Sequence, residues 1–232
     1  IVDQGPDFFL LLQDLAPAEQ GDQLLGCTPA VAACALRELV GLHAPGWCNE
    51  GLRSLTWLRD EQTAPAIDTM DLYRLQLPGF VERFAPLVEA DEIAIIQALG
   101  QAKQSPLSAQ LPEVFSLIHV DYRLDNLLIQ QTGDAYQVTA VDWQSITLGA
   151  PLNDVAYFVG AGLEPGVRRP AEEQLIRDYH QGLMDRGVQN FSWQQCWEGY
   201  RSGSFAGFVV TVIASMLVQR TARGDEMFTT MA

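Results

Sequence analysis

Lysine is almost absent from this chain, which has 232 residues and a single lysine, Lys103. The 14 basic residues face 29 acidic ones, and the formal net charge is −15. A nucleic-acid partner requires a basic surface that neutralises phosphates, so this composition argues against one. The acidity is compatible with a cationic substrate, and at least as compatible with a charge that only keeps the protein in solution.

Cysteine is also scarce, and its spacing excludes a C-x-x-C metal or redox motif. The four cysteines are Cys27, Cys34, Cys48 and Cys196. Without such a pattern, free thiols in a reducing compartment are favoured over disulfides. We therefore expect a cytoplasmic protein.

The sequence lacks a hydrophobic run long enough to cross a membrane. The apolar run over residues 205–218 falls short of the roughly 18–20 residues that a spanning helix needs, so we expect a buried central helix and no membrane partner. Gly199, Gly203 and Gly207 recur every four residues, which would let a neighbouring helix approach closely. A membrane dimerisation motif is the alternative interpretation of this spacing.

Most of the chain is patterned for helices. Thr28 followed by Pro29 has the form of an N-cap and a first helical residue. Ser192 and Gln195 form a capping box for a helix that reaches about Gln219. With 48% hydrophobic residues, the chain can bury a substantial core as one domain.

Three further helical regions are expected between these two. The first covers about 69–100 and is interrupted near Pro78 and near Pro86. The others cover about 152–159 and 172–184, where apolar residues have helical spacing.

Short strands are expected around one polar segment. The apolar run 115–118 predicts a strand that leads into a loop. The runs 127–129 and 136–141 predict two more strands, with the turn residues 131–134 between them. Such a hairpin would fold Asp142 back toward the loop.

The loop contains Asp121 and Asn126, and this set of side chains suits phosphoryl transfer. Mg²⁺ prefers hard oxygen ligands and is usually held by one or two carboxylates together with substrate phosphates. Asn126 and Asp142 are therefore the predicted metal ligands. That assignment leaves Asp121 free to accept the proton of a substrate hydroxyl.

The pattern H-x-D-x-x-x-x-N, followed by D-W after a strand, resembles the catalytic segment of protein-kinase-like phosphotransferases. More narrowly, it resembles the aminoglycoside/choline phosphotransferase superfamily, in its ecdysteroid-kinase-like or choline-kinase-like branch. That superfamily writes H-G-D-x-x-x-x-N and D-[WF]-[EQ], which correspond here to residues 119–126 and 142–144. Residues 149–158 are similar to the following G-x-P-x-x-D-L-A-y-f, and residues 9–15 resemble the hinge L-L-L-E-D-L.

The resemblance implies an α+β, mainly helical fold with a few short strands around the catalytic loop. The implied fold is that of the C-terminal (large) lobe of a protein-kinase-like phosphotransferase. It would occupy residues 1–232 as a single domain that begins at the hinge. The implied activity is transfer of the γ-phosphoryl group of ATP, with Mg²⁺, to a hydroxyl of an aminoglycoside-, choline- or sterol-like small molecule. Backbone groups of Gln13, Asp14 and Leu15 would meet the adenine.

Other polar residues of the segment are expected to have supporting roles. His119 would brace the loop by hydrogen bonds rather than act as an acid–base catalyst. Arg123 could touch a phosphate, although a salt bridge with a carboxylate is the favoured role. Asp154 would cap the following helix or support the catalytic loop. His43 and His180 lie in helical contexts, where packing or surface roles are expected.

Two features depart from the superfamily's pattern. Val120 stands where the superfamily has glycine, which restricts the backbone at a position where glycine would permit a positive φ. Such enzymes also carry an N-terminal lobe with a glycine-rich strand pair and a phosphate-binding lysine. Lys103 follows the hinge in a helical context, and no G-x-G-x-x-G precedes the hinge. We therefore expect this sequence to be the C-terminal lobe of a longer protein, folded but inactive when it is expressed alone.

Two other functional classes fit the same residues. One is a catalytically silent pseudo-kinase or regulatory module that has kept the loop. The other is a Mg²⁺-dependent phosphohydrolase that uses the same carboxylates on water.

Overall fold

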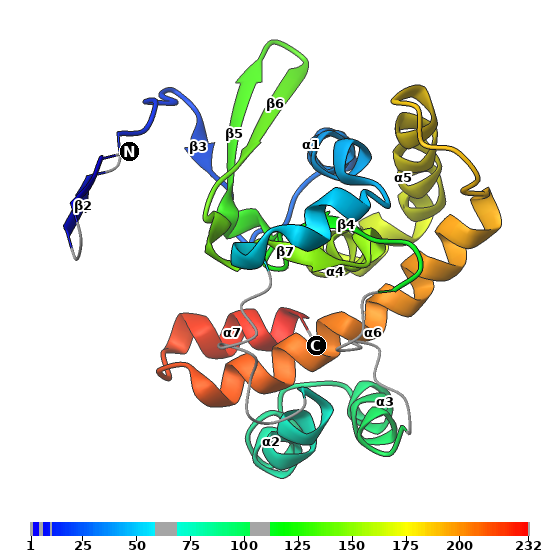
Figure 1. The fold of residues 1–232 in the computed structure, drawn as a ribbon. Coiled ribbons are helices and arrows are strands. Elements are labelled where there is room, and N and C mark those ends of the chain that lie inside the picture. Colours follow the sequence, from blue (N-terminus) through cyan, green and yellow to red (C-terminus); the bar gives the residue numbers. More distant parts are fainter. Residues whose placement is uncertain (1, 5–6, 10, 59–68, 103–111, 232) are drawn as a thin grey trace.

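The computed structural model describes residues 2–4, 7–9, 11–58, 69–102 and 112–231. Lys103, with its predicted helical context, lies outside these ranges. Figure 1 shows an upper group of elements that contains α1, α4, α5 and the β5–β6 hairpin. A lower group contains α2, α3 and α7, and the long helix α6 runs through both groups (Figure 1).

The fold is mainly helical, as predicted. The helices are α1 (Pro29–Gly46), α2 (Thr69–Phe84), α3 (Ala90–Gly100), α4 (Pro151–Gly162), α5 (Pro165–Asp185), α6 (Trp193–Leu217) and α7 (Ala222–Met231). The predicted caps are confirmed: Thr28 Oγ1 accepts from Val31 N at 3.3 Å, and Ser192 with Gln195 forms a capping box. Each cap pairs backbone amides that a helix start leaves without partners.

The predicted interruption near Pro78 is wrong, because α2 continues through it to Phe84. Proline removes one backbone hydrogen bond of a helix, but packing of an apolar face supplies most helical stability. Phe80 and Phe84 of α2 are fully buried in the lower core. Gly79 lies at a close approach to α6, since a Cβ there would come within 2.8 Å of Met216 Cε. The second predicted break is confirmed, because α2 ends before Pro86.

The strands are short and form three small antiparallel sheets. They are β1 (Val2–Gln4), β2 (Asp7–Phe9), β3 (Glu19–Gln20), β4 (Ser116–Ile118), β5 (Leu127–Thr132), β6 (Ala135–Ala140) and β7 (Thr147–Gly149). The predicted hairpin is confirmed, with Leu127 opposite Ala140 and Thr132 opposite Ala135. β3 pairs with β5, and β4 pairs with β7.

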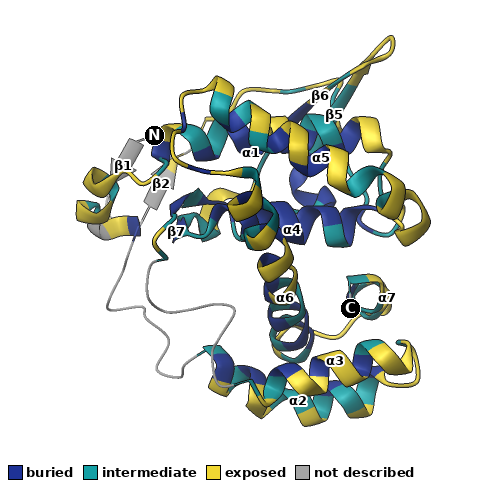
Figure 2. Ribbon diagram, turned by 90° about the vertical axis from the view of Figure 1, so that its right-hand side faces the viewer, coloured by how far each residue is buried: buried dark blue, intermediate teal, exposed yellow. Residues whose placement is uncertain are grey.

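The core has two large hydrophobic clusters, to both of which α6 contributes, and a small third cluster of Leu58, Phe115 and Leu148. Buried residues are concentrated along α4 and the parts of α1, α5 and α6 around it (Figure 2). Cys196 and Tyr200 of α6 belong to this upper cluster, whereas Val209 and Val212 belong to the lower one with α2 and α3. The helix therefore joins the two halves of the fold.

The glycine repeat of α6 marks its close approach to α4. A Cβ on Gly203 would lie 2.7 Å from the backbone oxygen of Leu152, a distance that no side chain tolerates without movement. The expectation that this region is too short for a membrane span is wrong: over its 25 residues α6 is long and apolar enough to cross a membrane by length and composition alone, with 39% of its most apolar window buried. Because it contacts α2, α4, α5 and α7, it serves here as a shared core helix.

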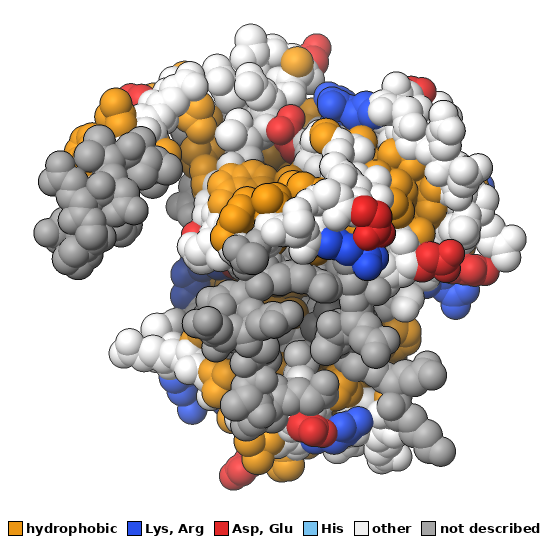
Figure 3. Space-filling view, in the orientation of Figure 1, with side chains coloured by type: hydrophobic (Ala, Val, Ile, Leu, Met, Phe, Trp, Pro, Cys, Tyr) orange, Lys and Arg blue, Asp and Glu red, His pale blue; other side chains and the backbone are white. Residues whose placement is uncertain are grey.

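Charged side chains on the face shown in Figure 3 lie in small mixed groups, and hydrophobic side chains gather below the β5–β6 hairpin.

The four cysteines are all free thiols, as predicted. Burial raises the pKa of Cys27 and of Cys196 to about 12, so both remain protonated at neutral pH.

Candidate active site

The loop after β4 carries a strained backbone. Val120 has a φ of +73°, in the left-handed region that branched side chains rarely adopt. The branched Val120 therefore adopts the backbone conformation that the superfamily's glycine would permit at this position. Asp121 is the next residue, and its side chain is 35% exposed.

Asp154, in the first turn of α4, holds this loop by its backbone. Its Oδ2 accepts from His119 N at 2.6 Å, and its Oδ1 accepts from Val120 N at 2.9 Å. The side chain is 1% exposed. These contacts correspond to support of the loop, one of the two roles expected for Asp154.

His119 connects the loop to the segment after β6. The side chain is fully buried, and its Nε2 lies 2.9 Å from the backbone oxygen of Val141. Its backbone oxygen accepts from Ser145 Oγ at 2.8 Å, and its ring lies 4.8 Å from that of Trp143. A fully buried imidazole suits the bracing role rather than proton exchange with a substrate.

Three side chains donate to the carboxylate of Asp121. Oδ1 accepts from Arg123 Nε at 3.1 Å and from Tyr157 Oη at 3.4 Å, and Oδ2 accepts from Asn126 Nδ2 at 2.8 Å. Burial, and next the charge of Asp121, raise the pKa of Tyr157, so its hydroxyl stays a donor. The sequence placed Tyr157 in a family motif but gave no sign of this contact.

Asn126 and Asp142 are brought together through the backbone. Asn126 is buried, and its backbone oxygen accepts from Val141 N at 2.9 Å, so Asp142, the next residue, begins beside it. Because the amide nitrogen of Asn126 donates to Asp121, its side-chain oxygen is the atom left for a cation. Asp142 is exposed and lies in the left-handed region with a φ of +67°.

The donor chemistry of this pair fits Mg²⁺, which takes oxygen ligands and leaves part of its shell to phosphates and water. Within the part of the chain that the structure describes, no group of three or more His, Cys, Asp or Glu side chains could hold a metal. A site made of one amide and one carboxylate lies outside that criterion, and it needs the phosphates to complete it.

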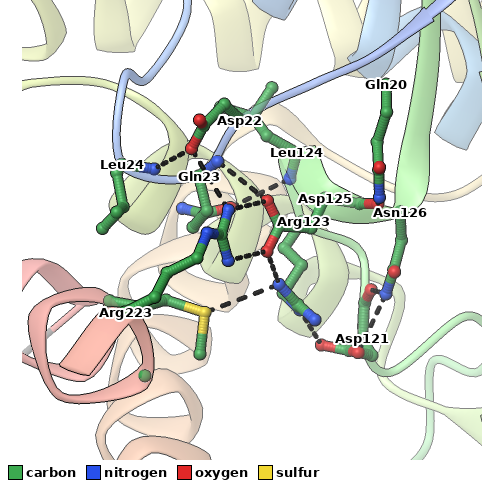
Figure 4. A network of polar contacts seen from close by, with 12 residues as sticks. Gln20, Asp22, Gln23, Leu24, Asp121, Arg123, Leu124, Asp125, Asn126 and Arg223 are labelled. Atoms are coloured by element: carbon green, nitrogen blue, oxygen red, sulfur yellow. Dashed lines mark hydrogen bonds and ion pairs between the residues drawn. The ribbon is translucent and has the colours of Figure 1, made fainter. Parts of the chain in front are cut away.

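Arg123 belongs to a larger network around Asp125 (Figure 4). Arg123 Nη1 lies 2.5 Å from Asp125 Oδ2, so the structure gives Arg123 the expected salt-bridge role. Gln23 N and Arg223 of α7 also donate to the Asp125 carboxylate. Burial by itself would raise the pKa of Asp125, but the hydrogen bonds from Arg223, Gln23 and Arg123 outweigh it and lower this pKa to about 2.

The N-terminal segment contacts the loop from another side. The fully buried Gln23 accepts from Leu124 N at 2.9 Å through Oε1 and donates from Nε2 to the backbone oxygen of Ala161 at 2.5 Å. Gly21 lies so close that a Cβ would come within 2.6 Å of the Leu124 oxygen. The sequence gave no indication that these residues, about a hundred positions before the loop, pack against it.

The predicted hinge residues lie apart from this cluster. Gln13 and Asp14 are exposed and Leu15 is half-buried, in the segment that enters β3. Asp14 Oδ1 accepts from Ala16 N at 2.9 Å. Among the described residues, no hydrogen bond or ion pair joins Gln13, Asp14 or Leu15 to the loop. The adenine contact therefore stays a prediction.

A cavity of about 470 Å³ borders Tyr157 and is lined by residues of α4, α5 and α6 and of the lower helices α3 and α7. Its lining includes Tyr157, Arg168, Glu172, Tyr200 and Phe208. Tyr200 Oη donates to Glu172 Oε1 at 2.5 Å, which fixes one wall. Tyr157 therefore lines this space and also donates to the carboxylate of Asp121.

Two solved structures are similar to this chain in fold. The choline kinase of Cryptosporidium parvum Iowa II has a TM-score of 0.50 and 13% identity, with 94% of this chain and 68% of that chain covered. The ethanolamine kinase Pv091845 of Plasmodium vivax has a TM-score of 0.54 and 13% identity, with 94% and 62% covered. This chain therefore spans less than two thirds of the second kinase. The predicted mainly helical, protein-kinase-like fold with a few short strands is confirmed.

Sequence comparison gives the family. A mouse protein, Acyl-CoA dehydrogenase family member 10, is 32% identical over 95 residues, which are 40% of this chain and 9% of that protein. The model of the ecdysteroid kinase-like family matches residues 63–189. That match covers more than half of the chain, and the protein belongs to the ecdysteroid kinase-like family.

Proposed function

We propose that this protein transfers the γ-phosphoryl group of ATP to a hydroxyl of a small molecule. The family and the similar kinases support a small-molecule phosphotransferase at the coarser level. The observation that carries the proposal is the partly exposed carboxylate of Asp121, which accepts a hydrogen bond from Asn126. The backbone of Asn126 in turn bonds to Val141, the residue before Asp142. A proton acceptor and two oxygen donors for a cation are thereby held side by side.

Asp121 is the proposed general base. A carboxylate oxygen can accept two hydrogen bonds, and Oδ1 already receives Arg123 and Tyr157 whereas Oδ2 receives only Asn126. Oδ2 is therefore the atom with room for the hydroxyl of an acceptor. A positioned base of this kind contributes about 10²–10⁴-fold to a rate.

Asn126 and Asp142 are the proposed holders of Mg²⁺, through the amide oxygen and the carboxylate. Bound ATP would supply the phosphoryl group, and Mg²⁺ held by these two residues would neutralise the charge that develops on it. Backbone groups of Gln13, Asp14 and Leu15 are proposed to meet the adenine. An N-terminal lobe outside this sequence is proposed to supply a phosphate-binding lysine, with residues 1–232 forming one domain.

The acceptor would occupy the cavity beside Tyr157, where Glu92, Glu164 and Glu172 outnumber Arg168. This excess of negative charge would favour a cationic amino alcohol, and the aromatic walls leave room for an aminoglycoside-, choline- or sterol-like molecule. A cytoplasmic location, where ATP is supplied, is part of the same proposal and agrees with the free thiols.

The decisive experiment measures ADP release by the purified full-length protein with Mg·ATP and a panel of amino alcohols, aminoglycosides and sterols. We expect release that depends on one class of acceptor, with phosphorylated acceptor recovered. Full-rate phosphate release without an acceptor would identify a phosphohydrolase. Absence of any Mg·ATP binding by calorimetry would identify a pseudo-kinase or regulatory module.

A further inference from the structure

Behind the catalytic loop, three buried side chains from three helices form a hydrogen-bonded chain. Tyr179 of α5 has its Oη 2.7 Å from His43 Nδ1, and His43 of α1 has its Nε2 3.4 Å from Asp154 Oδ2. All three residues are at most 1% exposed. His43 was expected to have an ordinary packing role, and the structure shows instead that it connects α5 with the residue that supports the loop.

The donors and acceptors of this chain can all be paired. A carboxylate oxygen of Asp154 accepts, and Nε2–H of His43 donates to it. The Tyr179 hydroxyl can then donate to His43 Nδ1. Burial raises the pKa of Tyr179 well above its usual value, which keeps that hydroxyl protonated and donating. A buried polar chain with every member satisfied specifies one geometry.

Asp154 connects the three-residue hydrogen-bonded chain to the loop through two backbone amides. The two amides that it accepts, from His119 and Val120, flank the point where the backbone enters the left-handed region at Val120. A branched residue keeps such a conformation only when its surroundings hold it there. Asp121 follows immediately, so the orientation of the Asp154 carboxylate fixes where the Asp121 side chain begins.

We propose that His43 is a positioning residue, which orients Asp154 so that the loop keeps its strained turn and Asp121 stays aimed at the acceptor. The catalytic consequence rests on the proposed function, whereas the effect on the loop does not. His43 acts through Asp154 and touches neither substrate nor nucleotide. Tyr179 acts one step further away by fixing the tautomer of His43.

The test compares His43→Leu with His180→Leu in the full-length protein. His180 of α5 is a matched control, because its Nε2 lies 2.8 Å from the Phe191 oxygen and it has no contact with the loop among the described residues. We expect His43→Leu to speed hydrogen exchange of the His119 and Val120 amides by about tenfold or more. We also expect a fall in kcat of about 10- to 100-fold with KM values near normal, since misplaced reacting groups lower the rate of the chemical step.

A second pair of variants separates positioning from loss of core packing. Glycine at position 120 adopts the turn without strain, so Val120→Gly should reduce the effect of His43→Leu on amide exchange and on kcat in a double-mutant cycle. Equal effects in both backgrounds would overturn the proposal. If His43→Leu does not fold, Tyr179→Phe, which removes only the hydroxyl, should show the same changes in weaker form.

The remaining outcomes are also decisive. The proposal is wrong if His43→Leu and Tyr179→Phe leave both loop amides and kcat as they are in His180→Leu. It is also wrong if amide exchange changes while kcat does not. A wild-type protein that phosphorylates no acceptor would reject the proposed function, and amide exchange would still decide the role of His43 in the loop.

Discussion

Arg223 donates two hydrogen bonds to the carboxylate of Asp125, from Nη1 to Oδ2 at 3.1 Å and from Nη2 to Oδ1 at 3.0 Å. The contact joins α7 to the catalytic loop across 98 positions of sequence. Asp125 also accepts from Arg123, whose Nε donates to Asp121. The C-terminal helix and the proposed base therefore share one network of charges.

This network predicts how the stability of the fold depends on pH. The pKa of Asp125 is lowered from 3.8 to about 2 in the folded chain. A lowered pKa contributes stability that is present above the unfolded value and is lost as the pH falls through the folded value. Arg223→Gln raises the folded pKa, so we expect lower stability at neutral pH and an acid transition that begins at a higher pH.

Circular dichroism between pH 6 and pH 2 at low ionic strength measures this transition. Arg177→Gln is the control, because it removes an exposed ion pair with Glu173 and a cation–π contact with Trp193 but none of the contacts around Asp125. Identical acid transitions for Arg223→Gln and Arg177→Gln would show that the Arg223–Asp125 contact has no role in stability.

The second prediction concerns the proposed base. Asp121→Asn should leave folding and Mg·ATP binding largely intact, because Arg123 keeps its ion pair with Asp125. Transfer to a verified acceptor should fall by about two to four orders of magnitude, the usual span for general acid–base catalysis. Steady-state turnover of the purified variant checks this, and a near-normal rate would rule out Asp121 as the base.

The third prediction concerns the metal. Asp142→Ala should weaken Mg·ATP binding more than Asn126→Ala, since a carboxylate contributes a full charge and an amide only a dipole. Calorimetric titration with Mg·ATP, repeated with ATP and chelator, gives the order. Unchanged affinity in both variants would reject this pair as the ligands.

Local chemistry made much of the fold predictable from the sequence. The cap at Thr28, the capping box at Ser192 and the turn in the β5–β6 hairpin each depend on residues within a few positions of one another. The error at Pro78 came from tertiary packing, because Phe80 and Phe84 of α2 are buried in one cluster with residues of α6, and a local rule does not see such contacts.

The candidate site likewise has a part that the sequence predicts and a part that it does not. Asp121, Asn126 and Asp142 lie within one short segment, and a hairpin suffices to bring them together. The contacts of Gln23, Arg223 and His43 with this region span 101, 98 and 111 positions, to Leu124, Asp125 and Asp154 respectively. Such contacts arise only when distant parts of the chain pack together, so no spacing in the sequence could indicate them.

The fourth prediction measures the strain at Val120. At an ordinary site glycine is less stable than alanine by about 0.5–1 kcal/mol. In the left-handed region the order reverses, because a Cβ costs about 1–2 kcal/mol there. Val120→Gly should therefore be more stable than Val120→Ala by about 1 kcal/mol in urea unfolding. The usual order, with alanine more stable, would show that the turn is unstrained.

The last prediction concerns the contact between α4 and α6. A Cβ on Gly203 would lie 2.7 Å from the Leu152 backbone oxygen, whereas one on Gly207 would lie 3.7 Å from Tyr157 Cδ2, an ordinary contact. Gly203→Ala must push the helices apart, and overpacking costs about 1–3 kcal/mol. Gly207→Ala has no such clash and gains about 0.5–1 kcal/mol from better helix propensity. Both are measured by urea unfolding. Both variants replace glycine by alanine in the same helix, so changes of opposite sign in the free energy of unfolding would be due to the contact with α4. Equal changes would contradict the close approach at Gly203.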